Sequence, residues 1–243
     1  FADKFDDPMM YAQAVKSVSV PTQSILFNID IEGPLTKDKT AVLRVFAKMF
    51  YNHCGFYGDD LKIAKLERFI EKQGKTQQFR EAFEKVNGAP WTETRDSFAF
   101  FEDDIVSVLQ STLGMSEQAA RNWFNGEETN ELSIAQLVAD IQEYVDGKGK
   151  DFRLLFMVDE VGQYIGDDGD LMINLQSLVE EIGIRCHGKV WVMVTSQEAI
   201  DSVVHITGND FSKIQGRFNT RLSLSSSSVD EVIKKRVLAK TDA

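Results

Sequence analysis

The sequence predicts an α/β protein: a parallel sheet flanked by helices, with a large helical insertion. Near both ends of the 243-residue chain, strand-like apolar runs alternate with segments of helical periodicity, as in strands joined by helical crossovers. Residues 59–147 show helical periodicity and no strand-like alternation. We therefore divide the chain into three parts: residues 1–58 and 148–243 belong to the α/β core, and residues 59–147 form the insertion.

The first strand and helix of the core are expected within residues 18–54. The segment at residues 25–31 is apolar, contains β-branched residues and follows Pro21, so a strand is predicted within residues 18–32. Apolar residues then recur at helical spacing over residues 39–54, with Asp38 as a candidate N-cap and Gly55 as a stop. The sequence thus begins with a strand followed by an amphipathic helix.

The insertion is expected to contain about five short helices, since its apolar residues repeat with the helical period. Breaks between these helices are predicted at Gly74, at residues 88–90, at Gly114 and at Gly126. The segment has no fixed repeat length, which argues against a helical solenoid.

After a linker at residues 147–150 the sequence returns to an α/β pattern. Residues 152–158 form a continuous apolar run, as a doubly buried parallel strand requires. Further strands are predicted over residues 190–194 and 220–224, helices over 171–183, 197–204 and 229–239, and a helical turn over 210–216. This spacing implies right-handed crossovers in a parallel sheet.

Composition and charge exclude several classes of protein. A hydrophobic fraction of 43% and a charged fraction of 27% exclude a disordered or fibrous chain. The sequence has no apolar run of roughly 18 residues that would predict a transmembrane helix. The net charge of −11 argues against chain-wide electrostatic binding of nucleic acid, and the small basic patch at residues 234–236 is interpreted as a solvated helix face.

The cysteines and histidines give neither a disulfide framework nor a metal site. Two cysteines in a chain of this length are typical of a reducing cytoplasm. The adjacent pairs His53-Cys54 and Cys186-His187 lack the spacing of metal ligands, so buried thiols and ordinary histidines are favoured.

The most specific local signal is the pair of carboxylates that follows the strand at residues 152–158. Asp159 and Glu160 come directly after that apolar run, where uncompensated carboxylates are costly. The pair is explained if one carboxylate orients magnesium on a nucleotide phosphate and the other activates the attacking water. Open α/β sheets also bind ligands at the carboxyl ends of their strands. An ordinary acidic loop is the alternative.

Polar residues follow the next strands as well. Thr195-Ser196-Gln197 comes after residues 190–194 and would orient a γ-phosphate or the attacking water. The alternative is a helix N-cap at Thr195 or Ser196, and the two roles are compatible. Arg217 and Arg221 flank the start of the strand at 220–224, where an arginine would neutralise phosphate at a subunit interface. A surface charge is the alternative for each arginine.

The order of these elements resembles an AAA+ ATPase core. It runs from the Walker B-like Asp159-Glu160, through the sensor 1-like Thr195-Ser196-Gln197, to an arginine region at residues 216–218 and the start of a lid at residues 232–238. Residues 159–165 and 208–218 look like the large P-loop ATPase of BREX phage-defence systems (the BrxC/PglY type). The likeness is strongest over residues 150–243 and weak at residues 24–30.

The resemblance implies a cytoplasmic bacterial enzyme that binds ATP and Mg²⁺ and hydrolyses ATP. Its partners would be a methyltransferase, a phosphatase-like protein and other defence-system components, with phage DNA in the assembly and no membrane. Asp159 would hold Mg²⁺ through the nucleotide, and Glu160 would polarise the attacking water.

The resemblance also implies roles for the residues after the later strands. Thr195 would contribute to cofactor binding, and Ser196 or Gln197 would orient the γ-phosphate region. Arg217, with Arg221 as the second candidate, would be the arginine finger acting across an interface in a homo-oligomer.

The sequence departs from the family pattern at the glycine loop G-x-x-x-x-G-K-[ST], whose backbone amides cradle phosphates. Residues 69–76 end in Gly-Lys-Thr, but they begin with Phe69 and follow a helical segment. Residues 33–40 carry Asp38 in place of the second glycine, and Pro34 lacks an N–H donor. The loop is therefore expected upstream of Phe1.

An upstream glycine loop has two consequences. The first strand of the AAA+ sheet, which would lie between the strands at 190–194 and 220–224, is expected to be missing from this fragment. The isolated fragment is expected to be inactive. A nucleotide-gated scaffold that binds protein partners or DNA and hydrolyses little is the alternative function, although an intact Asp159-Glu160 pair favours hydrolysis.

Overall fold

A computed structural model describes residues 7–34, 36–125 and 132–196, together with residues 218, 220 and 222. The described core is α/β, as predicted. Its sheet has three parallel strands in the order β1-β2-β3. They are β1 (Thr22–Asn28), β2 (Arg153–Asp159) and β3 (Val190–Val194), and they lie within or within one residue of the predicted strands. The first strand is shorter than predicted: residues 29–31 of the apolar run begin a helix, because the Asn28 side chain caps it by accepting from two backbone N–H groups.

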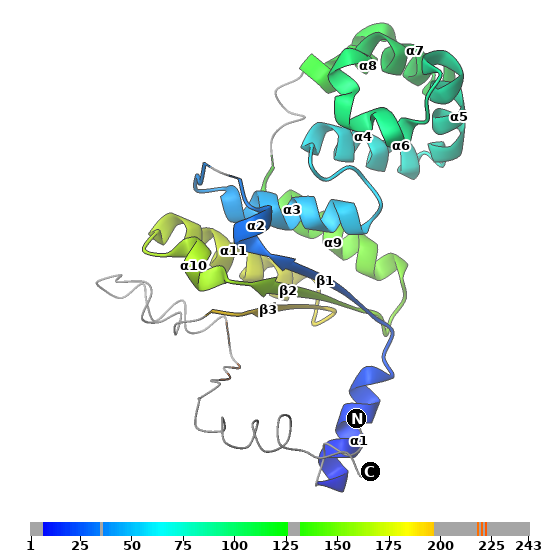
Figure 1. Ribbon diagram of the computed structural model, residues 1–243. Helices are drawn as coiled ribbons and strands as arrows, with labels where there is room; N and C mark the ends of the chain where they lie inside the picture. The colour runs from blue at the N-terminus through cyan, green and yellow to red at the C-terminus, as the bar shows by residue number, and fades with distance from the viewer. Residues whose placement is uncertain are drawn as a thin grey trace, which may run out of the picture. The chain divides into compact units, whose positions relative to one another are not determined.

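Helices cover one face of this sheet (Figure 1). They are α3 (Ala41–His53), α9 (Ile134–Gly147) and α11 (Gly169–Arg185), and α11 contacts both α3 and α9. The buried ring of Phe46 in α3 lies 5.5 Å from that of Phe27 in β1 and 5.3 Å from that of Phe156 in β2. Burying an aromatic side chain of this size stabilises a fold by about 1.5–3 kcal/mol, so this contact fixes α3 on the sheet.

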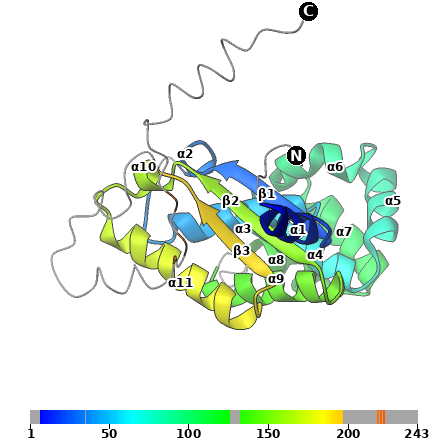
Figure 2. The same ribbon diagram turned by 90° about the horizontal axis from the view of Figure 1, so that it is seen from below.

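The opposite face of the sheet is open among the described residues (Figure 2). Side chains alternate along each strand, so Ile25 and Phe27 face the helices while Leu26 is 69% exposed. Trp191 and Met193 on β3 are 60% and 50% exposed. The apolar run at residues 152–158 predicted a strand buried on both faces, but in β2 only Leu154, Phe156 and Val158 are buried, because no described helix covers the second face.

Two short helices follow the first two strands at the carboxyl edge of the sheet. α2 (Ile29–Glu32) begins directly after β1. α10 (Val161–Ile165) follows β2 after a single residue, Glu160. These two helices contact each other. They frame the edge at which the predicted site residues lie.

The segment predicted as an insertion forms a helical layer with a hydrophobic cluster of its own. Its helices are α4 (Leu61–Lys72), α5 (Thr76–Asn87), α6 (Trp91–Thr94), the 3-10 helix η2 (Arg95–Phe100), α7 (Glu102–Leu113) and α8 (Glu117–Asn125). Every member of the cluster comes from residues 63–124. Breaks occur as predicted at Gly74, Gly88 and Gly114, each with positive φ, whereas Gly126 lies outside the described residues.

The last helix of the predicted insertion packs with the core instead of with that cluster. α9 contacts α11 and α3, and its buried residues include Leu137, Ile141 and Val145. Arg68 of α4 forms ion pairs with Asp140 and Glu143 of α9. The helical layer is thus joined to the core through charged side chains.

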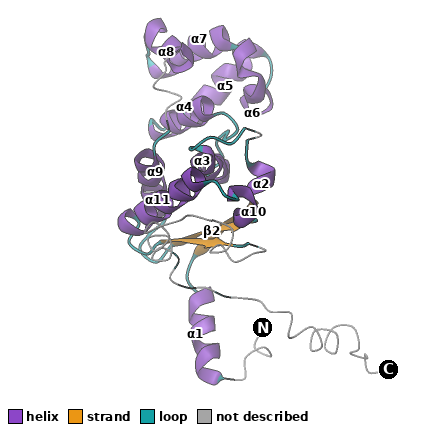
Figure 3. Cartoon of the chain, turned by 90° about the vertical axis from the view of Figure 1, so that its left-hand side faces the viewer, coloured by secondary structure: helices purple, strands orange, loops and turns teal. Residues whose placement is uncertain are grey.

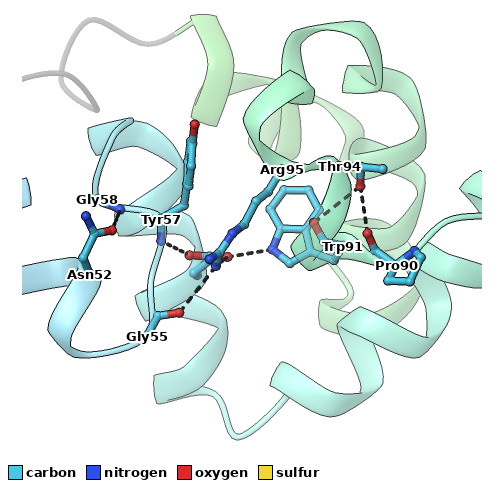
Figure 4. A network of polar contacts seen from close by, with 9 residues as sticks. Asn52, Gly55, Tyr57, Gly58, Pro90, Trp91, Thr94 and Arg95 are labelled. Carbon is cyan, nitrogen blue, oxygen red and sulfur yellow. Dashed lines mark hydrogen bonds and ion pairs between the residues drawn. The ribbon is translucent and has the colours of Figure 1, made fainter.

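A buried carboxylate organises the start of the helical layer. Figure 4 shows its partners Tyr57, Trp91 and Arg95. Glu67 is 7% exposed and accepts hydrogen bonds from the Tyr57 backbone N–H at 2.5 Å and from the Trp91 indole N–H at 2.7 Å. Arg95 lies 3.0 Å from the same carboxylate. Glu67 therefore ties three separate segments together.

The N-terminal helix α1 (Pro8–Val18) was not predicted. Asp7 caps it by accepting from the Met9 N–H, and Pro8 occupies the first turn, where its missing N–H costs nothing. None of its residues is buried. Among the described residues, no helix is long and apolar enough to cross a membrane.

Candidate functional site

The candidate site lies at the carboxyl edge of the sheet, where three strand ends meet. Asn28 at the end of β1 is in register with Asp159 at the end of β2. The Thr195 N–H donates to the carbonyl of Val158 at 2.9 Å, which places the end of β3 beside Asp159. Parallel pairing thus gathers polar residues from three distant parts of the sequence.

Thr195 contacts both predicted carboxylate residues. Its hydroxyl donates to Asp159 Oδ1, and the backbone N–H of Glu160 points to Thr195 Oγ1 at 3.3 Å and to Asp159 Oδ1 at 3.1 Å. The Thr195 carbonyl accepts from the Val161 N–H at 3.0 Å. The Thr195 side chain therefore fixes the orientation of Asp159, while its backbone secures the turn that carries Glu160.

Glu160 has a left-handed backbone, with φ of 60° and ψ of 29°. This conformation costs a residue with a Cβ about 1–2 kcal/mol. Hydrogen bonds around the turn hold it, including one from the Tyr164 N–H to the Glu160 carbonyl at 3.1 Å. Strained residues of this kind occur frequently in active sites. The turn lifts the Glu160 carboxylate toward β1.

Asn28 receives that carboxylate and is a site residue that sequence reasoning missed. Its Nδ2 donates to Glu160 Oε2 at 2.8 Å, while its Oδ1 accepts from the N–H groups of Asp30 and Ile31 at 2.9 and 3.2 Å. The amide side chain supplies the donor and the acceptor on separate atoms. The available signal was its position, because Asn28 ends a strand just as Asp159 does.

Three of the remaining predicted residues lie outside the described part of the chain. These are Gln197, Arg217 and Arg221. Thr220 and Leu222, within the strand predicted at 220–224, have no regular secondary structure, and Leu222 is 88% exposed. Ser196 is partly buried, and its enclosed hydroxyl has no hydrogen-bond partner among the described residues.

The loop after α2 contacts α10 through Lys37. Lys37 donates from Nζ to the Tyr164 carbonyl at 2.9 Å, lies 4.0 Å from the centre of the Tyr164 ring and is 3.7 Å from Asp30. Burial, with the nearby charges of Asp30 and Asp38, raises the pKa of Tyr164. Asp38 accepts from Thr40 and pairs with Arg44. Lys37 and Asp38 of this loop therefore both bind other groups of the protein.

The segment with the Gly-Lys-Thr tail lies in the helical layer. Gly74 and Lys75 connect α4 to α5, and the Lys75 ammonium donates to Gln78 at 2.8 Å. A helix precedes this loop, where a phosphate cradle requires a strand. Residues 33–40 lie between β1 and α3, but they follow the short helix α2 and carry Asp38 in place of the second glycine.

The chemistry available at the site comes from its carboxylates. Asp159 is exposed, and its Oδ2 accepts no hydrogen bond from the described residues, so it is open to a cation or a bound water. Glu160 offers a proton acceptor within the same turn. Within the described ranges, no group of three or more His, Cys, Asp or Glu side chains could hold a metal ion by itself. No protein-family model matches this sequence, and no solved structure matches this fold.

Proposed function

We propose that this chain forms part of an AAA+-type ATPase core that hydrolyses ATP and works in a bacterial BREX phage-defence assembly. The proposal rests on the resemblance of residues 150–243 and on the site at the carboxyl edge of the sheet. One observation carries it: Asp159 and Glu160 end the central strand, Thr195 from the next strand holds Asp159, and Asn28 from the first strand holds Glu160.

The donor set at this edge suits magnesium bound to a nucleotide. Mg²⁺ usually takes one or two carboxylates and completes its shell with phosphate oxygens and water. Asp159 would supply that carboxylate through its open oxygen, and the bound ion would neutralise charge on the phosphates. Thr195 keeps the Asp159 carboxylate oriented, and Glu160 would accept the proton of an attacking water.

Glu160→Gln in the intact protein tests the assignment of the proton acceptor. The amide keeps the size of the side chain but cannot accept a proton, so we expect nucleotide binding to persist and turnover to fall by about 10²–10⁴-fold. Asp167→Asn is the matched control, because Asp167 is an exposed carboxylate in the loop after α10. ATP binding without turnover in the unsubstituted protein would instead favour the nucleotide-gated scaffold.

Arg217 is the proposed arginine finger, and Arg221 is the second candidate. Loss of an arginine that stabilises the transition state lowers phosphoryl transfer by roughly 10³–10⁵-fold, so we expect Arg217→Ala to lower hydrolysis while the protein stays folded. If the finger acts across an interface, mixing Glu160→Gln and Arg217→Ala subunits should partly restore turnover. No rescue, with activity independent of protein concentration, would favour a structural role for Arg217.

A further inference from the structure

The open face of the sheet is apolar across all three strands. It is made by alternating residues that point away from α3, α9 and α11: Leu26, Leu155, Met157, Trp191 and Met193. Strand register places Leu26, Met157 and Met193 in one row and sets Leu155 beside Trp191 in the next. A continuous apolar surface of this kind needs a covering element.

The helix α1 carries an apolar side that fits this need. At 100° per residue, one side of the helix is apolar and carries Met10, Tyr11, Ala14, Val15 and Val18. The other side is mainly polar and carries Gln13, Lys16 and Ser17 together with Met9. Met10, Val15 and Val18 are 59%, 41% and 69% exposed. This is the pattern of a helix that packs on a sheet with one side, yet none of its residues is buried.

The connection between α1 and the sheet is short and ends at the right place. Only Ser19, Val20 and Pro21 separate α1 from β1, and the Pro21 carbonyl accepts from the Arg153 N–H at 2.9 Å. Folded back from this point, α1 would run antiparallel to the strands. Eleven helical residues span about 16 Å, which fits the roughly 16–23 Å of strands with five to seven residues.

The topology leaves one face for α1. The chain advances from β1 to β2 to β3, and right-handed crossovers in one direction place their helices on one face. α3, α9 and α11 fill that face, whereas α1 leaves the sheet on the other side (Figure 3). We infer that α1 of the same chain docks on the open face by folding back at Ser19–Pro21.

Cross-linking in the full chain tests this docking. Folded back, α1 would bring Val15 over Leu155, so a Val15→Cys/Leu155→Cys double variant should give an intramolecular product with a short bis-maleimide. Gln13→Cys/Leu155→Cys is the matched control and should react less, because Gln13 is on the polar side of α1. The natural thiols interfere little, since burial raises the pKa of Cys54 to about 12 and that of Cys186 to about 11.

Trp191 emission provides a second readout that needs no new cysteine. We expect Val15→Asp to shift the Trp191 emission to the red, and Gln13→Asp to leave it unchanged. The Trp191 signal is obtained by subtracting the spectrum of the Trp191→Phe protein in each background, after circular dichroism shows that the variants fold.

A cross-linked dimer would overturn the inference in favour of α1 from a second copy. Equal cross-linking of the two pairs, with unchanged Trp191 emission, would overturn docking of α1 altogether.

Discussion

Glu67 is a buried side chain of the helical layer with three polar partners. Its carboxylate accepts from the Tyr57 backbone and the Trp91 indole and pairs with Arg95, while only 7% of the residue is exposed. A buried carboxylate is tolerated only when it is paired and hydrogen-bonded. The surrounding donors in turn depend on it, because Trp91 is also buried.

Removal of Glu67 should therefore destabilise the protein strongly. Glu67→Ala leaves the Trp91 and Tyr57 N–H groups without their acceptor and Arg95 without its partner, so the free energy of unfolding should fall by about 2–4 kcal/mol. Glu71→Ala, one turn further along α4 and exposed, is the matched control and should change stability by roughly 0.5 kcal/mol or less. Urea denaturation measures both, and equal effects would show that the Glu67 contacts contribute little.

Residues of the candidate site were predictable where their chemistry conflicts with their surroundings. Asp159 and Glu160 follow an apolar strand, and Thr195 follows another, so parallel pairing was enough to bring them together. Asn28 was missed because the strand was expected to continue past it, whereas β1 ends at Asn28. Its contact with Glu160 spans 132 positions in sequence, and no local pattern encodes such a pairing.

At the scale of elements, the long strands and helices followed from hydrophobic periodicity. β3 was predicted to the residue because it is a short run of apolar and β-branched residues. α11 was predicted within two residues at each end because it buries regularly spaced apolar side chains. Three helices were missed for physical reasons. The polar side of α1 is interrupted by Met9, α2 was expected as the end of the first strand, and α10 has only five residues and depends on the turn at Glu160. Short or weakly amphipathic helices leave little periodic signal.

Glycine positions in the helices should separate two opposite effects on stability. Gly88 ends α5 with φ of 85°, so Gly88→Ala should lower the free energy of unfolding by about 1 kcal/mol through backbone strain. Gly183 lies within α11 with open space where a Cβ would be, so Gly183→Ala should raise it by roughly 0.5–1 kcal/mol. Thermal unfolding measures both, and shifts of the same sign would contradict this assignment of backbone effects.

At the scale of the whole molecule, charge and topology oppose tight binding of free nucleotide by this chain. The net charge is −11, and the site presents two carboxylates to a ligand that is itself an anion. Lys37, which contacts α10, is already engaged by Tyr164 and Asp30. A phosphate cradle is needed to overcome this repulsion.

Calorimetry of the isolated 243-residue chain with MgATP should therefore show no micromolar binding. A titration with ATP in the absence of Mg²⁺ is the control and should give the same baseline. Tight binding that requires Mg²⁺ would reveal a phosphate site within this chain. Lys37 and Lys39 would then be the first residues to substitute.

The left-handed backbone of Glu160 bears on how such a sequence persists over evolutionary time. Glycine at position 160 would relieve the backbone strain of a residue with φ of 60°. A mutation to glycine would therefore remove this strain, but it would also remove the carboxylate. Against the relief of strain stands the loss of the hydrogen bond from Asn28 to the carboxylate. A lineage that keeps the glutamate therefore keeps it for its side chain, through this contact and the chemistry of the site.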